Sequence, residues 1–195
     1  MKDYKDPYFK KIISYSFKKK KFKFAVAYTL FSTFKIDMGS NLLLKTIKVD
    51  SSPGRILDLG CGYGTLGVVL ATLFSKAKII MSDKDLLAIK YSGYNCRLNK
   101  VSNVEMVGGV GIENVAFESY DLIVSNIPAK IGDLAIEQEF ILKPLKLLKP
   151  GGQYWFVVVS GLNRLIPKIG SRNNLNLKKV KKRKGHTVFR VANSI

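Results

Sequence analysis

The sequence predicts an α/β fold: a doubly wound, mostly parallel, seven-stranded sheet with an antiparallel last strand, preceded by an N-terminal strand and helix extension. Short apolar runs alternate with helical stretches after residue 54, and a glycine-rich segment follows the first run. A Lys184-Gly185 turn separates two valine-containing runs near the end of the chain. Strand–helix–strand repeats require right-handed crossovers, which place helices on both faces of a parallel sheet.

The elements follow in order along the chain. Residues 22–36 are rich in aromatic and β-branched side chains and predict one or two strands. Asp37-Met-Gly-Ser40 predicts a turn into a helix over residues 41–47, with Ser40 as its candidate cap. A final hairpin is expected to pair Val180 with residues 188–191. The central strands are expected at residues 55–59, 78–81, 104–107, 122–125 and 154–159, and the helices at 65–74, 86–99 and 134–148.

The chain of 195 residues is long enough for one domain with a sizeable core, and it contains no repeat or Pro/Ser linker. We expect a basic N-terminal appendage over residues 1–21 and a single domain over residues 22–195. Residues 18–31 run from lysines into an apolar stretch, but the A-x-A pattern comes too early for a signal peptide, so a buried strand is favoured. No apolar run approaches the ~18 residues of a membrane helix. Cys61 and Cys96 lack metal-ligand spacing, so we expect no metal site. Without a secretory context we expect no structural disulfide between them, and therefore a reducing, cytoplasmic location.

The formal net charge of +19 is concentrated at the two ends of the chain. Residues 1–36 hold ten Lys and two Asp, residues 37–139 hold ten basic and twelve acidic residues, and residues 140–195 hold thirteen basic residues and no acidic one. Cations confer solubility less effectively than acids do, so solubility explains this pattern poorly. Neutralising phosphates releases counterions, and the charge therefore predicts a nucleic-acid partner. Charge alone does not choose between RNA and DNA.

The segment ILDLGCGYGTLG, residues 56–67, contains Gly62-x-Gly64-x-x-Gly67, the spacing of a nucleotide-binding loop between a strand and a helix. Asp83 follows Gly64 by 19 residues, where a carboxylate can accept both ribose hydroxyls of an adenosine. The competing interpretation of Asp83 is an ordinary exposed carboxylate.

Asp58 decides between ligands, because a pyrophosphate would be repelled by it. S-adenosylmethionine instead carries a sulfonium and an ammonium group, which a nearby carboxylate favours, and its own carboxylate can use loop N–H groups. The alternative role for Asp58 is a helix cap or turn acceptor. The predicted cofactor contacts are Asp58, Gly60, Cys61, Gly62, Gly64, Asp83, Lys84 and Asn126.

These motifs resemble those of class I S-adenosylmethionine-dependent methyltransferases with a Rossmann-like sheet. More narrowly, the chain is similar to small-domain methyltransferases related to ribosomal small-subunit RNA guanine-N2 methyltransferases, in their compact, single-domain, archaeal-type form. The resemblance covers about residues 28–192, and D-x-G-S-x-L-L-L over residues 37–44 is its most specific part. It also includes Thr29-Leu-Phe-Ser32, the glycine loop, Asp83, Ser125-Asn-x-Pro128, Lys149-Pro-Gly-Gly152 and Gly185-His-Thr-Val-Phe-Arg190. The resemblance favours RNA as partner, with ribosomal RNA first and transfer RNA second.

Relatives carry Asn-Pro-Pro and an aromatic residue after the fourth strand. The Asn oxygen and a backbone carbonyl accept the N–H groups of an exocyclic amine and turn its lone pair toward the methyl group. Asn126 and Pro128 match this pattern and are the predicted catalytic residues, whereas Ile127 and Ala129 replace the first Pro and the stacking aromatic. Stacking contributes ~1–3 kcal/mol per base, enough to change a substrate preference. Relatives also often carry an acid near residues 107–112, where this chain has glycines and Val110, so we expect backbone contacts to adenine.

The turn of the final hairpin is expected at the carboxyl ends of the parallel strands, where ligands bind in such sheets. Lys182, Arg183 and Lys184 are therefore predicted substrate contacts, together with Lys130, for which simple solvation is equally supported. Lys18–Lys21 are expected to extend this rim. Neither cysteine is expected to react, His186 is expected to be a hairpin residue, and Trp155 is assigned to the core.

The predicted function is N-methylation of an exocyclic base amine of RNA, with guanine N2 of ribosomal RNA as the first candidate. One alternative is methylation of a protein amide or a small molecule. Another is a non-catalytic RNA-binding or ribosome-assembly protein, which the altered catalytic turn supports. The target nucleotide, the RNA species and the oligomeric state stay open.

Overall fold

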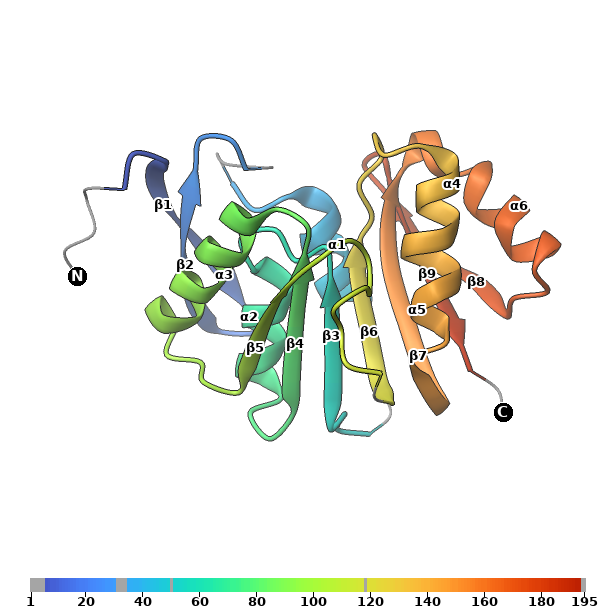
Figure 1. Cartoon of the computed structure of the whole chain (residues 1–195), viewed down its shortest axis with the longest axis horizontal. Coiled ribbons are helices and arrows are strands. Elements are labelled where there is room, and N and C mark those ends of the chain that lie inside the picture. The colour runs from blue at the N-terminus through green and yellow to red at the C-terminus, as the bar shows by residue number, and fades with distance from the viewer. Residues whose placement is uncertain (1–5, 31–34, 50, 118, 194–195) are drawn as a thin grey trace.

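The computed structural model describes residues 6–30, 35–49, 51–117 and 119–193. A seven-stranded sheet has the order β5-β4-β3-β6-β7-β9-β8 and is flanked by helices on both faces (Figure 1). β3, β4, β5, β6 and β7 are parallel, whereas β9 is antiparallel to both of its neighbours, so the predicted fold class is confirmed. The strands are β3 (Arg55–Leu59), β4 (Lys78–Asp83), β5 (Val104–Gly108), β6 (Tyr120–Asn126), β7 (Leu148–Val159), β8 (Leu177–Arg183) and β9 (His186–Ala192).

Two apolar cores lie on opposite faces of this sheet. On the first face, here called the α1 side, α1 (Met38–Thr46) packs against β7 and β9, whose Trp155 and Val188 belong to this core. On the same side α2 (Thr65–Leu73) and α3 (Leu86–Leu98) pack against β3, β4 and β5. On the second, the α4–α6 side, the packing helices cover Phe156 and Phe189. They are α4 (Asp133–Ala135), the π-helical segment η1 (Ile136–Leu142), α5 (Lys143–Leu145) and α6 (Leu165–Arg172), with the 3-10 turn η2 (Ser160–Leu162) before α6. Strands buried on both faces must be apolar throughout, which explains the continuous apolar runs in the sequence.

Two local expectations need correction, and one helix was not expected. The cap of α1 is Asp37, whose Oδ2 accepts the Ser40 N–H at 2.9 Å, rather than Ser40 itself. The helix expected over residues 134–148 ends at Leu145 and contains the π-helical segment. Helix α6 was not expected, because Pro167 and a glycine lie within its eight residues; the proline is in the first turn, where a missing N–H costs little.

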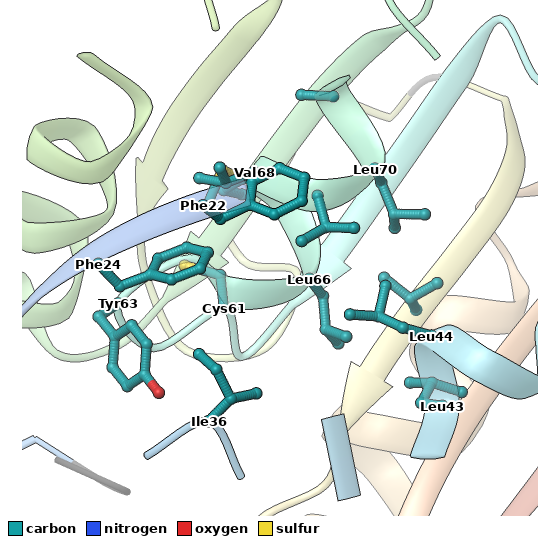
Figure 2. Close-up of a cluster of buried hydrophobic side chains, with 14 of the residues drawn as sticks. Phe22, Phe24, Ile36, Leu43, Leu44, Cys61, Tyr63, Leu66, Val68 and Leu70 are labelled. Atoms are coloured by element: carbon teal, nitrogen blue, oxygen red, sulfur yellow. The ribbon is translucent and has the colours of Figure 1, made fainter. Parts of the chain in front are cut away.

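An antiparallel hairpin of β1 (Phe9–Phe17) and β2 (Lys20–Ala27) precedes the sheet. The domain boundary expected at residue 21 therefore falls inside β2, and β1 lies where an appendage was expected. Figure 2 shows Phe22 beside Val68 and Phe24 beside Tyr63, and all four are buried in the α1-side core. The hairpin thus buries its aromatic side chains on the body of the protein, although lysines dominate its composition.

Asn95 of α3 and Asn99, the C-cap of that helix, hold β2 along its backbone. Asn95 accepts the Ala25 N–H (2.7 Å) and donates to the Ala25 carbonyl (2.9 Å), and Asn99 makes the same pair of bonds with Lys23 (3.0 and 2.7 Å). Each amide therefore substitutes for a residue of a neighbouring strand. α3 starts at the carboxyl end of β4 and runs back toward the opposite end of the sheet (Figure 1). Asn99, at the end of α3, binds Lys23 near the start of β2, so β2 begins at that opposite end. The lysines of the hairpin tip, residues 18–21, lie at that far end and do not extend the rim of the site as expected.

Candidate active site

The carboxyl ends of β3, β4 and β6 bring the predicted site residues to one edge of the sheet. β3 pairs with β4 on one side and with β6 on the other. Successive strands are therefore added in one direction from β3 to β5 and in the other direction from β6 to β7, although all of these strands are parallel. Ligands in doubly wound sheets bind at such a switch point, outside the carboxyl ends of the strands. The glycine loop follows β3, Asp83 ends β4 and Asn126 ends β6.

The glycine loop is fixed by its own backbone hydrogen bonds. Gly60 and Gly62 have φ angles of +72° and +56°, which glycine adopts without strain. The N–H groups of Gly60 and Cys61 both donate to the Ser82 carbonyl, at 2.8 and 2.9 Å, and the Gly64 N–H donates to the Cys61 carbonyl at 2.9 Å. These N–H groups are engaged within the protein, so the expectation that the loop offers them to the cofactor carboxylate is not met at these positions.

Asp58 lies beneath this loop and is fully buried. Its Oδ2 accepts the Gly67 N–H at 2.7 Å, which makes Asp58 a cap for the first turn of α2. Its Oδ1 is buried without a hydrogen-bond partner among the described residues. The pKa of Asp58 is raised to about 7, mainly because burial disfavours the charged form; the Gly67 hydrogen bond opposes this rise and the nearby charge of Asp83 adds to it. One oxygen of Asp58 thus caps helix α2, which is the competing role that the sequence offered for this residue, while the other oxygen has no hydrogen-bond donor among the described residues.

The other predicted cofactor residues surround the mouth of the loop. Asp83 Oδ2 accepts the Gly62 N–H at 2.8 Å, and its Oδ1 accepts the Asp85 N–H at 3.0 Å. Lys84 is exposed, whereas the Cys61 thiol is buried and its pKa is raised well above the usual value by that burial. A Cβ added at Gly62 would meet no atom within 4 Å, so this side of the loop is open. An orphaned carboxylate oxygen and an open glycine face fit a cationic, adenosine-bearing ligand.

Asn126 is held by the first turn of α1. Its Nδ2 donates to Asp37 Oδ2 at 2.7 Å and to Ser40 Oγ at 3.1 Å. A carboxylate only accepts hydrogen bonds, so the amide must present its NH₂ to Asp37 and its oxygen to the opposite side. The D-x-G-S stretch and the Asn-x-Pro turn, which the sequence treats as separate motifs, therefore form one unit. Sequence reasoning missed Asp37 because the contact is non-local.

The turn after Asn126 accommodates its departures from the family pattern. The Ile127 N–H donates to the Val157 carbonyl at 3.0 Å, a bond that a proline could not make, and its side chain is buried. Pro128, Ala129 and Lys130 are exposed at the mouth of the site. The replacement of the first proline is thus matched by a new backbone hydrogen bond, whereas the missing aromatic leaves a small exposed side chain.

The π-helical segment brings side chains to the glycine segments from the α4–α6 side. A Cβ at Gly111 would lie 2.6 Å from Glu139 Oε2, and a Cβ at Gly60 would lie 3.2 Å from the Phe140 ring. The Ser82 hydroxyl donates to the Gly111 carbonyl at 3.1 Å. The Glu139 carboxylate therefore lies beside the loop after β5, although it belongs to a segment about thirty residues further along the chain. A search for an acid within residues 107–112 of the sequence could not find it.

The turn of the final hairpin lies at the same edge. The Ser160 N–H donates to the Gly185 carbonyl at 2.8 Å, and a Cβ at Gly39 would lie 3.0 Å from His186 Cδ2 and 3.2 Å from Asn126 Oδ1. His186 begins β9, as expected of a hairpin residue, and its Nδ1 lies 3.0 Å from the Lys184 carbonyl. Trp155 is buried in the core as predicted, and both cysteines are free and buried.

Within the described part of the chain no group of His, Cys, Asp or Glu could hold a metal ion. The helices there include none long and apolar enough to cross a membrane.

The order of the sheet, with an antiparallel strand between β7 and β8, is that of class I methyltransferases, and the glycine loop, Asp58 and Asp83 lie at its switch point. The family model described as "Methyltransferase small domain" matches residues 21–190. The chain belongs to this family, whose members use S-adenosylmethionine, so the predictions of family and cofactor class are confirmed.

Relatives of known sequence agree with this assignment. YbxB of Bacillus subtilis is 32% identical over 74% of this chain and 72% of its own length. Ribosomal RNA small subunit methyltransferase C of Actinobacillus pleuropneumoniae is 36% identical over 64% of this chain, but the match spans only 38% of that protein. Among solved structures, the T. thermophilus 16S rRNA guanine-N2 methyltransferase, in complex with AdoMet and guanosine, has a TM-score of 0.78 at 22% identity, covering 94% of this chain and 50% of that one.

Proposed function

We propose that this chain is an S-adenosylmethionine-dependent N-methyltransferase that acts on an exocyclic base amine of RNA, with guanine N2 of ribosomal RNA as the first candidate. The observation that supports the proposal most directly is the orientation of the Asn126 amide. Asp37 and Ser40 accept its NH₂ group, so Oδ1 is left to accept a hydrogen bond at the carboxyl end of β6. An amine substrate needs an acceptor at this position.

The chemistry demands orientation more than acid–base strength. The lone pair of an exocyclic amine is delocalised into the base, and hydrogen bonding of its N–H to Asn126 Oδ1 turns that lone pair toward the donor. The amine nitrogen then forms a bond to the methyl carbon as the carbon–sulfur bond breaks, and the sulfur keeps the electron pair. The nitrogen becomes cationic and loses a proton to water, so no strong base is required in the site.

The cofactor would be held by residues that already stabilise one another. Asp83 would accept the ribose hydroxyls beside the open face of Gly62, and the exposed Lys84 lies next to it. Asp58 is buried, so it would act on the cationic sulfonium and ammonium groups through its charge, and not as an exposed contact. When bound, the cofactor supplies the electrophilic methyl group. Gly60, Cys61 and Gly64 would shape the loop around it.

RNA is favoured over a small molecule by the relatives named for ribosomal RNA and by the charge of the C-terminal segment, with thirteen cations and no acid over residues 140–195. Lys130 and Lys184 are exposed at the mouth of the site, and Arg183 pairs with His186 next to it. Lys182 pairs with Thr187, which points to the α4–α6 side. We propose Lys130, Arg183 and Lys184 as contacts for the RNA entering the site, and Lys182 as a more peripheral one.

The deciding experiment compares Asn126→Ala with the wild type. The variant should lose methylation of RNA from cells lacking the gene, as measured by nucleoside mass spectrometry, while calorimetry shows nearly unchanged binding of S-adenosylmethionine. Normal turnover by Asn126→Ala would refute the proposed role of the turn. Failure of the wild type to bind S-adenosylmethionine at high micromolar concentration would favour a non-catalytic RNA-binding protein instead, and methylation of peptides but not RNA would favour a protein amide substrate.

A further inference from the structure

The edge strand β8 carries cations on both of its faces, and its register with β9 shows which cations share a face. Paired residues of antiparallel strands point to the same side of the sheet. Lys178 pairs with Arg190, Lys181 with Val188 and Arg183 with His186. Val188 belongs to the α1-side core, so Lys178, Lys181 and Arg183 form a row on the α1 side.

A bulge creates this row. The register shifts between Lys179 and Lys181, so that the exposed Val180 is the extra residue and the alternation along β8 is interrupted. Lys179 pairs with Phe189, which belongs to the core of the α4–α6 side. Strict alternation would have put Lys179 and Lys181 on one face. Because of the bulge, three exposed cations lie on the α1 side at steps of two β9 residues, about 7 Å each.

This row lies level with the catalytic turn. Across the sheet Asn126 pairs with Val157, Val157 with Val188, and Val188 with Lys181. Four strands at a spacing of about 4.8 Å place the backbone of Lys181 about 14 Å from that of Asn126. The Asn126 side chain contacts α1 and so projects to the same side as the row. Arg183 lies one step nearer the carboxyl edge of the sheet, where the amine would be bound.

We propose that Lys178, Lys181 and Arg183 form a track for the backbone of the RNA substrate, which guides the strand across the α1 side of β8 toward Asn126. The proposal rests on the proposed function for the identity of the substrate. All three side chains are exposed, and the C-terminal segment that surrounds them contains no acid to compete with phosphate. Arg190 extends the row inward, with its guanidinium 5.9 Å from the centre of the Trp155 ring.

The competing explanation is that lysines on an edge strand merely prevent edge-to-edge aggregation. Protection against edge-to-edge pairing depends on the charge along the edge strand and does not depend on the face of the sheet on which each cation lies. A comparison of faces at equal charge therefore separates the two explanations.

The test variant is K178Q/K181Q/R183Q, and the control K146Q/K168Q/K179Q removes three exposed cations from the α4–α6 side of the same segment. Binding of a uridine oligonucleotide of about 20 residues is titrated at several salt concentrations. We expect the row variant to bind roughly tenfold more weakly or worse, and its slope of log K against log salt to fall by about two, since each phosphate contact in single strands contributes about 0.7. The control should stay close to the wild type in both.

Methylation of ribosomal RNA from cells lacking the gene is measured in parallel. The row variant should raise KM for RNA and leave the binding of S-adenosylmethionine unchanged. Equal losses of affinity in the two variants, or tighter wild-type binding to duplex DNA of the same length, would overturn the track. If the wild type methylates RNA in an Asn126-dependent way while the row variant matches the control, the track fails and the proposed function stands. If the wild type binds RNA but does not methylate it, while the row variant still binds RNA more weakly than the control and with a smaller salt slope, the proposed function fails and RNA binding by the row stands.

Discussion

Asp37 Oδ2 and Asn126 Nδ2 are joined by a 2.7 Å hydrogen bond across 89 residues of sequence. The same Asp37 oxygen accepts the Ser40 N–H at the start of α1. One carboxylate therefore begins a helix and fixes the direction of the amide at the end of β6. The start of α1 and the Asn126–Pro128 turn are therefore coupled, and a change in either should alter the geometry of the other.

This coupling predicts different outcomes for two substitutions of Asp37. Asp37→Ser keeps a good helix cap but is too short to reach Asn126, so turnover should fall by up to about a hundredfold through misplacement of the amide. Asp37→Asn retains an acceptor oxygen of the same reach and should recover most of the activity. Single-turnover methylation of RNA measures the effect, and binding of S-adenosylmethionine should change little in either variant. Equal activity of the two variants would contradict a positioning role for Asp37.

The raised pKa of Asp58, about 7, predicts a pH dependence of stability and of cofactor binding. The unfolded chain loses this proton near the ordinary value of 3.8 and the folded chain keeps it, so the contribution to stability falls between about pH 4 and pH 7 and is level above. A cationic cofactor favours the ionised form. Its affinity should therefore weaken below pH 7 by up to about tenfold per pH unit.

Calorimetry with S-adenosylmethionine between pH 5.5 and 8.5 measures this effect, and Asp58→Asn is the control. Asparagine still offers an oxygen to the Gly67 N–H but carries no titratable group. It should bind the cofactor more weakly above pH 7, and the part of the pH dependence that belongs to Asp58 should be absent. An identical pH profile in the wild type and the variant would show that Asp58 does not titrate in this range.

Asn95 in α3 and Asn99 at its C-cap both bind the backbone of β2, but we expect their removal to cost different amounts of stability. Asn95 is buried and also donates to the Tyr63 carbonyl at 2.8 Å, so Asn95→Ala leaves groups of β2 and of the glycine loop unpaired in the core. The free energy of unfolding should fall by about 3 kcal/mol. Asn99 is half-buried and bonds to an exposed part of β2, so Asn99→Ala should cost about 1 kcal/mol or less. Urea denaturation measures the free energy of unfolding of both variants. Similar decreases for Asn95→Ala and Asn99→Ala would mean that the hydrogen bonds of the two asparagines with β2 are equally exposed to water.

Much of the sheet could be predicted because its strands are buried on both faces. The expected strand at residues 55–59 coincides with β3, and the glycine loop and the Asn126–Pro128 turn follow their strands as expected. β1 was missed because residues 1–20 are mostly charged and aromatic, which hides the inward Ile13 and Phe17. α6 was missed because it contains a proline and a glycine.

The contacts that organise the site were not readable from local sequence. Asp37 with Asn126, Glu139 with the loop at Gly111, and the bulge at Val180 all depend on which distant segments the fold brings together. Spacing along the chain carries periodicity and motif information, but it does not report hydrogen bonds between residues in different elements. The position of the hairpin tip was wrong for the same reason, since the direction of β2 is set by its contacts with α3.

Substitution of Gly39, in the first turn of α1, is expected to lower turnover without lowering the melting temperature. A Cβ there would lie 2.8 Å from Asp37 Oδ2, 3.0 Å from His186 Cδ2 and 3.2 Å from Asn126 Oδ1, so it must displace the side chains that set the direction of the amide. Alanine favours a helix over glycine by up to about 1 kcal/mol, which offsets part of the crowding. Gly39→Ala should therefore keep the melting temperature near that of the wild type while turnover on RNA falls about tenfold or more.

The matched control is Gly161→Ala, because a Cβ there meets no atom within 4 Å and the change lies in the short turn η2 after β7. It should leave turnover and the melting temperature unchanged. Thermal denaturation and methylation kinetics are measured on both variants, together with KM for S-adenosylmethionine, which should stay constant. Full activity of Gly39→Ala would mean that the Asp37–Asn126 pair can move without loss of function, and a large drop in melting temperature would mean that the crowding is relieved by unfolding the first turn of α1.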